Sequence, residues 1–421
     1  MLFKYIKVKT KGQIEGEKLL VPKLRFKEFK DEWKEISLIN VFTFYNTNSL
    51  SRADLSEEGL IKNIHYGDIH QKFNNILDVN KEKLPYIKSD IKVNIHNEEN
   101  YCQDGDLILA DASEDYDGIG KAVEVINVGN NKIVSGLHTI LARDTNKVMS
   151  LGFKGYLFNI PLIHNQIRVL ANGFKVYGIS KNNIYDIDVR IPTKTEQEKI
   201  TNFLILLDKK IDLQQRRIEA LKIYKKGLMQ KLINSNNCEE KSISEFGTII
   251  TGTTPSKLIQ SYWHNGTIVW VTPSDITESK DIYNSHDMLT PDGLKAGRFV
   301  PAGSILITCI ASIGKNAILK VDGSCNQQIN AIIPNKNFNA DYLYYLFELK
   351  KDYLQSTAGT SATSIINKTS FEKLVFKIHN IGQQNEYSKI LNCLESKIET
   401  EKHKFKKLTL LKKSLLQQMF I

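Results

Sequence analysis

Residues 196–233 read EQEKITNFLILLDKKIDLQQRRIEALKIYKKGLMQKLI, a stretch with no proline and with Gly227 as its single glycine. Apolar side chains recur in it at alternating steps of four and three residues, which is the seam of a coiled-coil helix. Gln214 and Lys225 interrupt this seam with polar side chains. We therefore predict a long helix over residues 196–233, opened by a Thr-x-x-Glu capping box that begins at Thr195. The apolar positions of the seam are Ile200, Leu204, Leu207, Ile211, Ile218, Leu221, Leu228 and Leu232.

The end of the chain repeats this pattern at a constant offset. Each apolar seam position has a counterpart 187 residues later (387 − 200 = 187; 419 − 232 = 187). The polar interruptions obey the same offset, because Glu401 follows Gln214 (401 − 214 = 187) and Lys412 follows Lys225 (412 − 225 = 187). We predict a second long helix over residues 381–421 and a duplicated chain. The second seam consists of Tyr387, Leu391, Leu394, Ile398, Phe405, Leu408, Leu415 and Met419.

The segments that precede the two helices also correspond, with offsets that shrink along the chain. NIHYGDI at 63–69 aligns with WVTPSDI at 270–276 (270 − 63 = 207), and GDLILA at 105–110 aligns with GSILIT at 303–308 (303 − 105 = 198). The frame is kept while its loops change length. Loops on a fixed frame are where binding specificity varies, although neutral drift explains any single length change equally well.

Strand-like segments separated by Gly, Asn and Asp turns surround these motifs, so we expect mixed α/β domains. The predicted organisation is a leader and two globular domains, each followed by a long helix. The predicted boundaries are 1–20 for the leader, 21–195 for the first domain, 196–233 for the central helix, 234–380 for the second domain and 381–421 for the C-terminal helix.

Composition favours a polyanionic partner. The 421 residues are 41% hydrophobic and 25% charged, as in an ordinary globular protein, and they carry a net charge of +10. The five cysteines are scattered without a CxxC pair, so we expect neither a disulfide framework nor a structural zinc site. Signal peptide and membrane-spanning run are both missing from the sequence, which leads us to expect a cytoplasmic protein without membrane association.

Motifs of catalysis are missing. The sequence has no GxxxxGK[ST] phosphate loop, no GxGxxG after a strand, no NPPY-type run and no HExxH pair. The triplets Glu278–Lys280 and Glu348–Lys350 fit the ExK fragment of many nucleases, but this triplet is common by chance. Asp111, Asp115 and Asp117 form an acidic turn, for which a metal site is the alternative reading. We predict no catalytic and no metal-binding residue in this chain.

The second half contains ITGTTPSK at 250–257, YWHNGTIVWVTPSDI at 262–276, FVPAGSILIT at 299–308 and ASIGKNAIL at 311–319. In this order, and followed by the duplicated helix, these motifs resemble the target-recognition domain of type I restriction-modification specificity (S) subunits. The first half departs more, because FYNTNSLSRADL at 44–55 stands in place of the Gly-Thr-Thr-Pro loop.

The resemblance implies a mixed α/β fold with two target-recognition domains separated by two long antiparallel coiled-coil helices, in a pseudo-twofold internal repeat. It implies a non-catalytic chain that recruits methyltransferase (M) subunits and, through the complex, a restriction/translocase (R) subunit. S-adenosylmethionine, ATP and magnesium are then expected on those partners. Two reading domains on double-stranded DNA predict a bipartite, asymmetric target with an unread gap.

Base and phosphate contacts need polar and basic side chains on loops that reach the grooves. Trp33, Trp263 and Trp270 are instead expected in or around the core, and Asp68 and Asp275 are expected to cap turns. For the loop at 251–257, a structural turn fixed by Gly252 and Pro255 is the alternative. The predicted DNA-binding residues are Thr253, Ser256, Lys257, Arg298, Lys315, Lys121, Lys175, Tyr177, Ser361 and Thr363.

Five apolar helix residues lie off the main seam, so a continuous heptad pairing cannot bury all of them. We predict that Leu206, Leu213, Ile223, Met229 and Ile233 bind a partner subunit. Two other classes of function remain open at this point. One is a nuclease or methyltransferase with an unrecognised active site, and the other is a coiled-coil scaffold without a DNA role.

Overall fold

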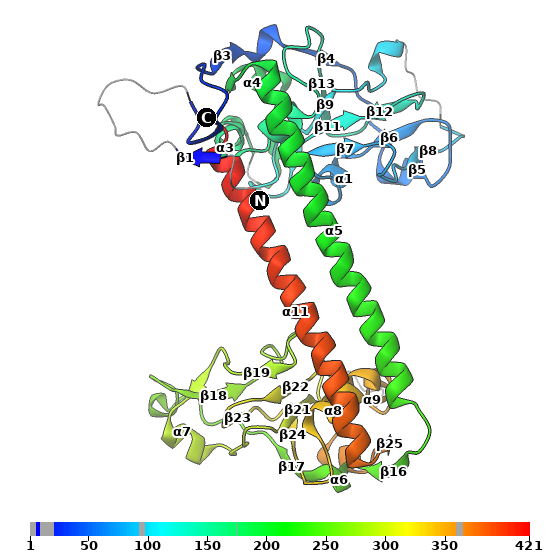
Figure 1. Ribbon diagram of the computed structural model, residues 1–421, viewed down its shortest axis with the longest axis vertical. Coiled ribbons are helices and arrows are strands. Elements are labelled where there is room, and N and C mark those ends of the chain that lie inside the picture. Colours follow the sequence, from blue (N-terminus) through cyan, green and yellow to red (C-terminus); the bar gives the residue numbers. More distant parts are fainter. Residues whose placement is uncertain (1–5, 9–20, 92–96, 174, 359–364) are drawn as a thin grey trace. The chain divides into compact units, whose positions relative to one another are not determined.

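The computed structural model describes residues 6–8, 21–91, 97–173, 175–358 and 365–421 (Figure 1). The chain divides into two compact units. Unit 1 consists of Met1–Leu213 and Phe405–Ile421, and unit 2 of Gln214–Lys404. Each unit thus holds a sheet-containing body together with a part of both long helices.

The body of unit 1 is built on a five-stranded sheet whose neighbours are antiparallel, apart from one parallel pair at its edge. Successive residues of a strand point to opposite faces, which gives this sheet two apolar faces. Leu107 and Leu109 pack into one core, while Ile108 and Ala110 pack into another. In spatial order the strands are β4 (Phe42–Tyr45), β13 (Thr139–Asp144), β9 (Leu107–Ala110), β11 (Ala122–Ile126) and β7 (Ile76–Asp78).

Helices cover one face of this sheet and a smaller sheet covers the other. The covering helices are α2 (Phe153–Leu157), α3 (Pro161–Leu170) and α4 (Lys181–Tyr185). The opposite layer consists of β12 (Ile133–Ser135), β6 (Lys62–Ile64), β8 (Tyr86–Ile87), β5 (Leu55–Ser56) and α1 (Tyr66–Gln71). Three strand pairs complete the unit: β3 (Lys34–Ser37) with β15 (Asp188–Ile191), β10 (Ala112–Ser113) with β14 (Tyr177–Gly178), and β1 (Ile6–Val8) with β2 (Leu24–Phe26).

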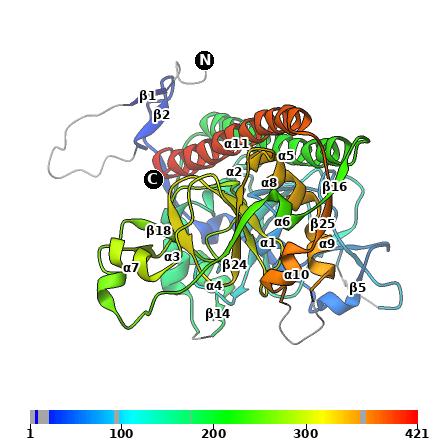
Figure 2. The same ribbon diagram turned by 90° about the horizontal axis from the view of Figure 1, so that it is seen from below.

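Unit 2 repeats this topology. Its five strands are β17 (Gly247–Thr251), β24 (Ile329–Pro334), β21 (Ile305–Thr308), β22 (Asn316–Leu319) and β19 (Asp281–Ile282), in the spatial order and with the strand directions of unit 1. One face packs against α8 (Ala340–Leu349) and α9 (Lys351–Ser356), so that α8 lies between α11 (Ile381–Gln418) and the sheet (Figure 2). The remaining elements are β18 (Ile268–Val271), β20 (Met288–Leu289), β23 (Gly323–Cys325), β16 (Glu239–Ser242), β25 (Val375–Ile378), α6 (Ile243–Phe246), α7 (Pro291–Ala296) and α10 (Lys368–Glu372).

The two long helices are α5 (Lys194–Ile233) and α11, and the polar interruptions of their seams bind acidic residues of the opposite helix. In unit 1, Lys412 Nζ lies 2.6 Å from Asp208 Oδ1. In unit 2, Lys225 forms the equivalent ion pair with Glu395, the residue 187 positions after Asp208. The pairing is antiparallel in unit 2, because Gln214 Nε2 also donates to Glu401 Oε2 at 2.6 Å. The predicted interruptions therefore pair with each other or with acidic residues across the helices.

The predicted capping box at Thr195 is wrong. Helix α5 begins at Lys194, and the carbonyl of Thr193 already accepts hydrogen bonds from the backbone N–H groups of Glu196 and Gln197, both at 3.0 Å. Thr195 therefore lies inside the first turn. The helix starts earlier because the protein body holds this turn: the Glu196 carboxylate accepts two hydrogen bonds of 2.7 Å from Arg25. Among the described residues, no helix has the length and apolar character needed to cross a membrane.

Candidate nucleic-acid interface

The loops that differ between the two units meet at one edge of each five-stranded sheet. In unit 1, β4 and β9 end at this edge, whereas β13 and β11 begin there, because neighbouring strands are antiparallel. The same holds for β17, β21, β24 and β22 in unit 2. We call this edge the loop edge. It is formed by residues 46–54, 65–72, 111–121 and 136–138 in unit 1, and by residues 252–263, 272–275, 309–315 and 326–328 in unit 2.

Lys121 and Lys315 occupy the same position on the two loop edges. The Lys121 carbonyl accepts a hydrogen bond from the backbone N–H of Ala110 at 2.9 Å, and the Lys315 carbonyl accepts one from Thr308 at 2.9 Å. Their side chains differ in surroundings. Lys121 Nζ donates to the carbonyl of His70 at 2.9 Å, and burial lowers the pKa of this lysine. Lys121 is therefore partly engaged by the protein, and the phosphate contact of either lysine stays a prediction.

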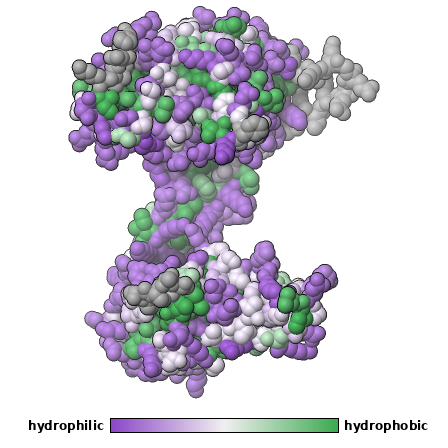
Figure 3. All heavy atoms as spheres, turned by 180° about the vertical axis from the view of Figure 1, so that it is seen from behind, coloured by the Kyte–Doolittle hydropathy of each residue, from purple (hydrophilic) through white to green (hydrophobic). Residues whose placement is uncertain are grey.

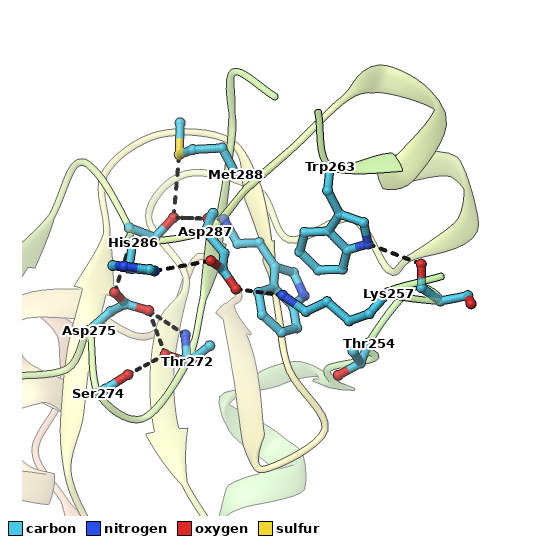
Figure 4. Close-up of polar contacts among 12 residues, drawn as sticks. Thr254, Lys257, Trp263, Thr272, Ser274, Asp275, His286, Asp287 and Met288 are labelled. Carbon is cyan, nitrogen blue, oxygen red and sulfur yellow. Dashed lines mark hydrogen bonds and ion pairs between the residues drawn. The ribbon is translucent and has the colours of Figure 1, made fainter. Parts of the chain in front are cut away.

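Lys257 lies in an aromatic and acidic pocket (Figure 4). Its Nζ atom is 3.8 Å from the ring centroid of Trp263 and 5.0 Å from that of Trp270, and it donates to Asp287 Oδ2 at 2.6 Å. This hydrogen bond lowers the pKa of Asp287. A cation held by two rings and a carboxylate fixes the loop that carries it. Lys257 is thus a positioning residue of the loop edge, whatever else it contacts.

The two tryptophans hold the same loop through its backbone. Trp270 Nε1 donates to the carbonyl of Thr253 at 3.0 Å, and Trp263 Nε1 donates to the carbonyl of Ser256 at 3.1 Å. Trp270 is buried, as is Trp33 in unit 1, so the expected core position of these two is confirmed. The Ser256 side chain is exposed, whereas Thr253 Oγ1 is a buried hydroxyl for which the described residues supply no hydrogen-bond partner.

A close backbone approach explains the glycine of this loop. A Cβ atom on Gly252 would lie 2.1 Å from the carbonyl oxygen of Asn326, which no side chain tolerates. Arg298 is exposed and reaches the base of the same loop, since its Nη1 atom donates to the carbonyl of Thr251 at 2.7 Å. Arg298 therefore contacts the segment that carries Thr253, Ser256 and Lys257.

Two further DNA-binding candidates, Lys175 and Tyr177, lie in the segment that ends at β14. Lys175 is exposed, and Tyr177 pairs with β10 and packs edge-on against Tyr116, with 5.1 Å between ring centroids. Ser361 and Thr363 lie outside the described residues.

The predicted partner surface is corrected for two of its five residues. Met229 and Ile233 are buried in the core of unit 2, with 5% and 2% of their surface exposed, because the body of unit 2 packs against that end of α5. Leu206, Leu213 and Ile223 are 64–74% exposed. Hydrophobic side chains on the long helices also show among hydrophilic ones in Figure 3.

The recurring aspartates have different roles. Asp275 Oδ2 accepts the backbone N–H of Thr272 at 2.8 Å, which is the expected turn cap. Asp68 does not cap: its buried carboxylate accepts two hydrogen bonds of 2.9 Å from Arg52. Burial acts to raise the pKa of Asp68, but Arg52 and Lys72 outweigh it and the pKa is lowered.

The sequence did not lead us to a cluster of histidines around Tyr66 on the loop edge of unit 1. The ring centroid of Tyr66 lies 4.7 Å from that of His65, 6.1 Å from His70 and 5.4 Å from His138. The segment IHYGDIH was a visible signal for three of these residues. His138 comes from a distant part of the chain, so only folding brings it here.

The three acidic residues for which a metal site was the alternative have partners within the protein. Asp111 Oδ1 lies 3.3 Å from His138 Nδ1, Asp115 accepts the backbone N–H of Gly118, and Asp117 pairs with Arg168. Within the described residues, no group of three or more His, Cys, Asp or Glu side chains is arranged to hold a metal ion.

Comparisons with known proteins agree with this architecture. Residues 235–410 match the family described as the type I restriction modification DNA specificity domain. The chain is 32% identical over 168 residues to the type I restriction enzyme MjaIX specificity subunit of Methanocaldococcus jannaschii, covering 38% of this chain and 39% of that protein. It is 30% identical over 166 residues to the EcoR124I/EcoR124II specificity subunit of Escherichia coli, covering 38% and 41%. The matches thus span about two fifths of these relatives.

The fold is similar over a longer range. The crystal structure of a type I restriction-modification S subunit from M. genitalium superposes with a TM-score of 0.58 at 12% identity, covering 95% of this chain and 99% of that one. A structure from work on complex assembly and conformational transition of the type I R-M system gives a TM-score of 0.56, also at 12% identity, covering 92% of this chain and 97% of that one. Residues 235–410 thus match the type I restriction modification DNA specificity domain, and the chain has a fold similar to that of a solved type I restriction-modification S subunit.

Proposed function

We propose that this chain is the sequence-specific DNA-binding subunit of a type I restriction-modification complex and that each unit reads one part of a bipartite, asymmetric target. The observation that carries the proposal is the repeated frame, which presents different loops at the same sheet edge in both units. A shared frame with unlike loops gives two related binding modes and two different preferred sequences.

The proposed target-recognition domains are residues 21–195 and 234–380, with 196–233 and 381–421 as the helical spacer and 1–20 as a leader. We propose contacts to bases or phosphates from ten residues of these two domains. They are Thr253, Ser256, Lys257, Arg298, Lys315, Lys121, Lys175, Tyr177, Ser361 and Thr363.

The proposed protein partners are methyltransferase subunits, and a restriction subunit through the assembled complex. The side chains of Leu206, Leu213 and Ile223 are apolar and exposed, which supports a docking surface on α5. Exposed apolar side chains mark interaction sites because a partner can bury them away from water. Catalysis and its S-adenosylmethionine, ATP and magnesium are proposed to reside on those partners in the cytoplasm. An isolated chain that cleaves or methylates DNA would instead support the enzyme alternative.

Exchange of the second domain tests the proposal. Residues 234–380 are replaced by the corresponding segment of another specificity subunit, and the targets of both chains are mapped by methylation of genomic DNA with the same methyltransferase partner. We expect one part of the target to change and the other to stay. A chimaera with both parts unchanged contradicts the proposal.

A further inference from the structure

His138 and Gln328 occupy the same position of the repeated frame. Each directly precedes the strand that begins at the loop edge, β13 in unit 1 and β24 in unit 2. The carbonyl of His138 accepts the backbone N–H of Asp111 at 3.1 Å, and the carbonyl of Gln328 accepts that of Cys309 at 2.8 Å. Two different side chains are therefore presented from the same backbone position in the two units.

His138 is held in an uncommon backbone conformation. Its φ of 55° lies in the left-handed region, which residues other than glycine rarely adopt. Such conformations cost free energy and concentrate at functional sites. The ring packs edge-on against Tyr66 at an interplanar angle of 81°, and Nδ1 lies 3.3 Å from Asp111 Oδ1. Half of the side chain, 50%, remains exposed, so the imidazole is oriented by the protein and open to a ligand.

The side chains that support His138 are themselves held by further contacts. Tyr66 also packs against the buried ring of His65 and against His70. His70 is fixed in turn, because its Nε2 atom donates to the carbonyl of Ala112 at 3.1 Å. Asp68 of the same segment is bound by Arg52. A side chain supported in this way meets the requirement for selective recognition, which is a preorganised geometry.

We propose that His138 is the residue that determines base specificity in unit 1 and that Gln328 has this role in unit 2. This inference rests on the proposed function, since it names the reading residue of the same interface. Gln328 is also oriented by a neighbour, because its Oε1 atom accepts from Asn326 Nδ2 at 3.1 Å.

The two side chains match different base edges. A neutral imidazole with its Nδ1–H directed to Asp111 presents the Nε2 lone pair as an acceptor. An acceptor suits the exocyclic amino group of adenine or cytosine in the major groove. A carboxamide carries both a donor and an acceptor, which suits adenine. The units then differ in the base that they select at this position.

Selection from a randomised duplex library tests the inference on the full chain. His138→Gly removes the imidazole and suits the positive φ, so the variant should keep its fold, which thermal melting checks. We expect it to lose about tenfold to a hundredfold of the discrimination at one base pair of the unit 1 half-site, the usual contribution of a base contact, without change in the unit 2 half-site. Gln328→Ala should lose discrimination at one base pair of the unit 2 half-site, without change in the unit 1 half-site.

Lys147→Gly is the matched control, because Lys147 is exposed, has a φ of 50° and lies at the opposite end of β13. It should leave the selected sequence unchanged. If His138→Gly selects the same bases as the unmodified chain, or weakens binding equally for all sequences, the inference is overturned and the proposed function stands. An unmodified chain that selects no bipartite sequence overturns both.

Discussion

At the scale of single residues, Lys257 is a predicted DNA contact that also holds its own loop in place through two tryptophans and Asp287. Its hydrogen bond to Asp287 lowers the pKa of that carboxyl, so the pair adds stability above the unfolded-state pKa of Asp287 and loses it as the pH falls through the lowered value. We expect Lys257→Met to keep the apolar stem between the tryptophans while the pKa of Asp287 rises towards its ordinary value. A side-chain NMR titration measures the shift. Chemical denaturation should show the loss of stability at neutral pH and a smaller loss below the lowered pKa.

Lys295→Met is the control for this substitution. Lys295 forms an ion pair of 3.1 Å with Asp292, and both side chains are largely exposed, at 79% and 68%. Exposed pairs contribute little to stability, so this variant should melt like the unmodified protein. An unchanged pKa of Asp287 in Lys257→Met would show that Lys257 and Asp287 do not form this hydrogen bond in solution.

At the scale of elements, polar layers set the register of the helix pair. Asp208 with Lys412 in unit 1 and Glu395 with Lys225 in unit 2 are equivalent pairs at the 187-residue offset. A slip along the seam would leave these charges facing apolar positions. We expect Lys412→Asp to destabilise unit 1 by about 1.5–3 kcal/mol, the range for hydrogen bonds to charged groups, and the exchange Asp208→Lys with Lys412→Asp to restore part of it. Chemical denaturation of the two single variants and the double variant measures the coupling.

Lys413→Asp makes the same charge change one residue further along α11, where the side chain is exposed. It should change stability by no more than about 0.5 kcal/mol. Additive effects of Asp208→Lys and Lys412→Asp would contradict a coupled pair.

At the scale of the whole molecule, the net charge of +10 predicts DNA binding that weakens steeply with salt, because bound phosphates release counterions. If Lys315 and Lys175 each contact a phosphate, Lys315→Gln and Lys175→Gln should each reduce the slope of log K against log salt by about 0.9. Titrations by fluorescence anisotropy over a range of salt concentrations measure it. Lys336→Gln is the control, since this exposed lysine follows β24 at the edge opposite the loop edge. Equal slopes for all chains would remove both lysines from the interface.

The sequence alone determined the features that depend on short-range order. The heptad seams, their polar interruptions and the repeat at 187 residues are periodic, so the long helices and the duplication could be predicted without contacts. The α/β character followed from strand and turn composition. The capping box failed because a contact from Arg25, far away in the chain, holds the first turn of α5.

Only the tertiary structure decided what each side chain touches. Met229 and Ile233 left the surface because the body of unit 2 packs on the end of α5. Lys257 acquired its role from two tryptophans and an aspartate brought together by folding. His138 joins Tyr66 and Asp111 because strand pairing, and no sequence motif, places the start of β13 beside the end of β9. Contacts between distant segments depend on packing, which a one-dimensional pattern does not encode.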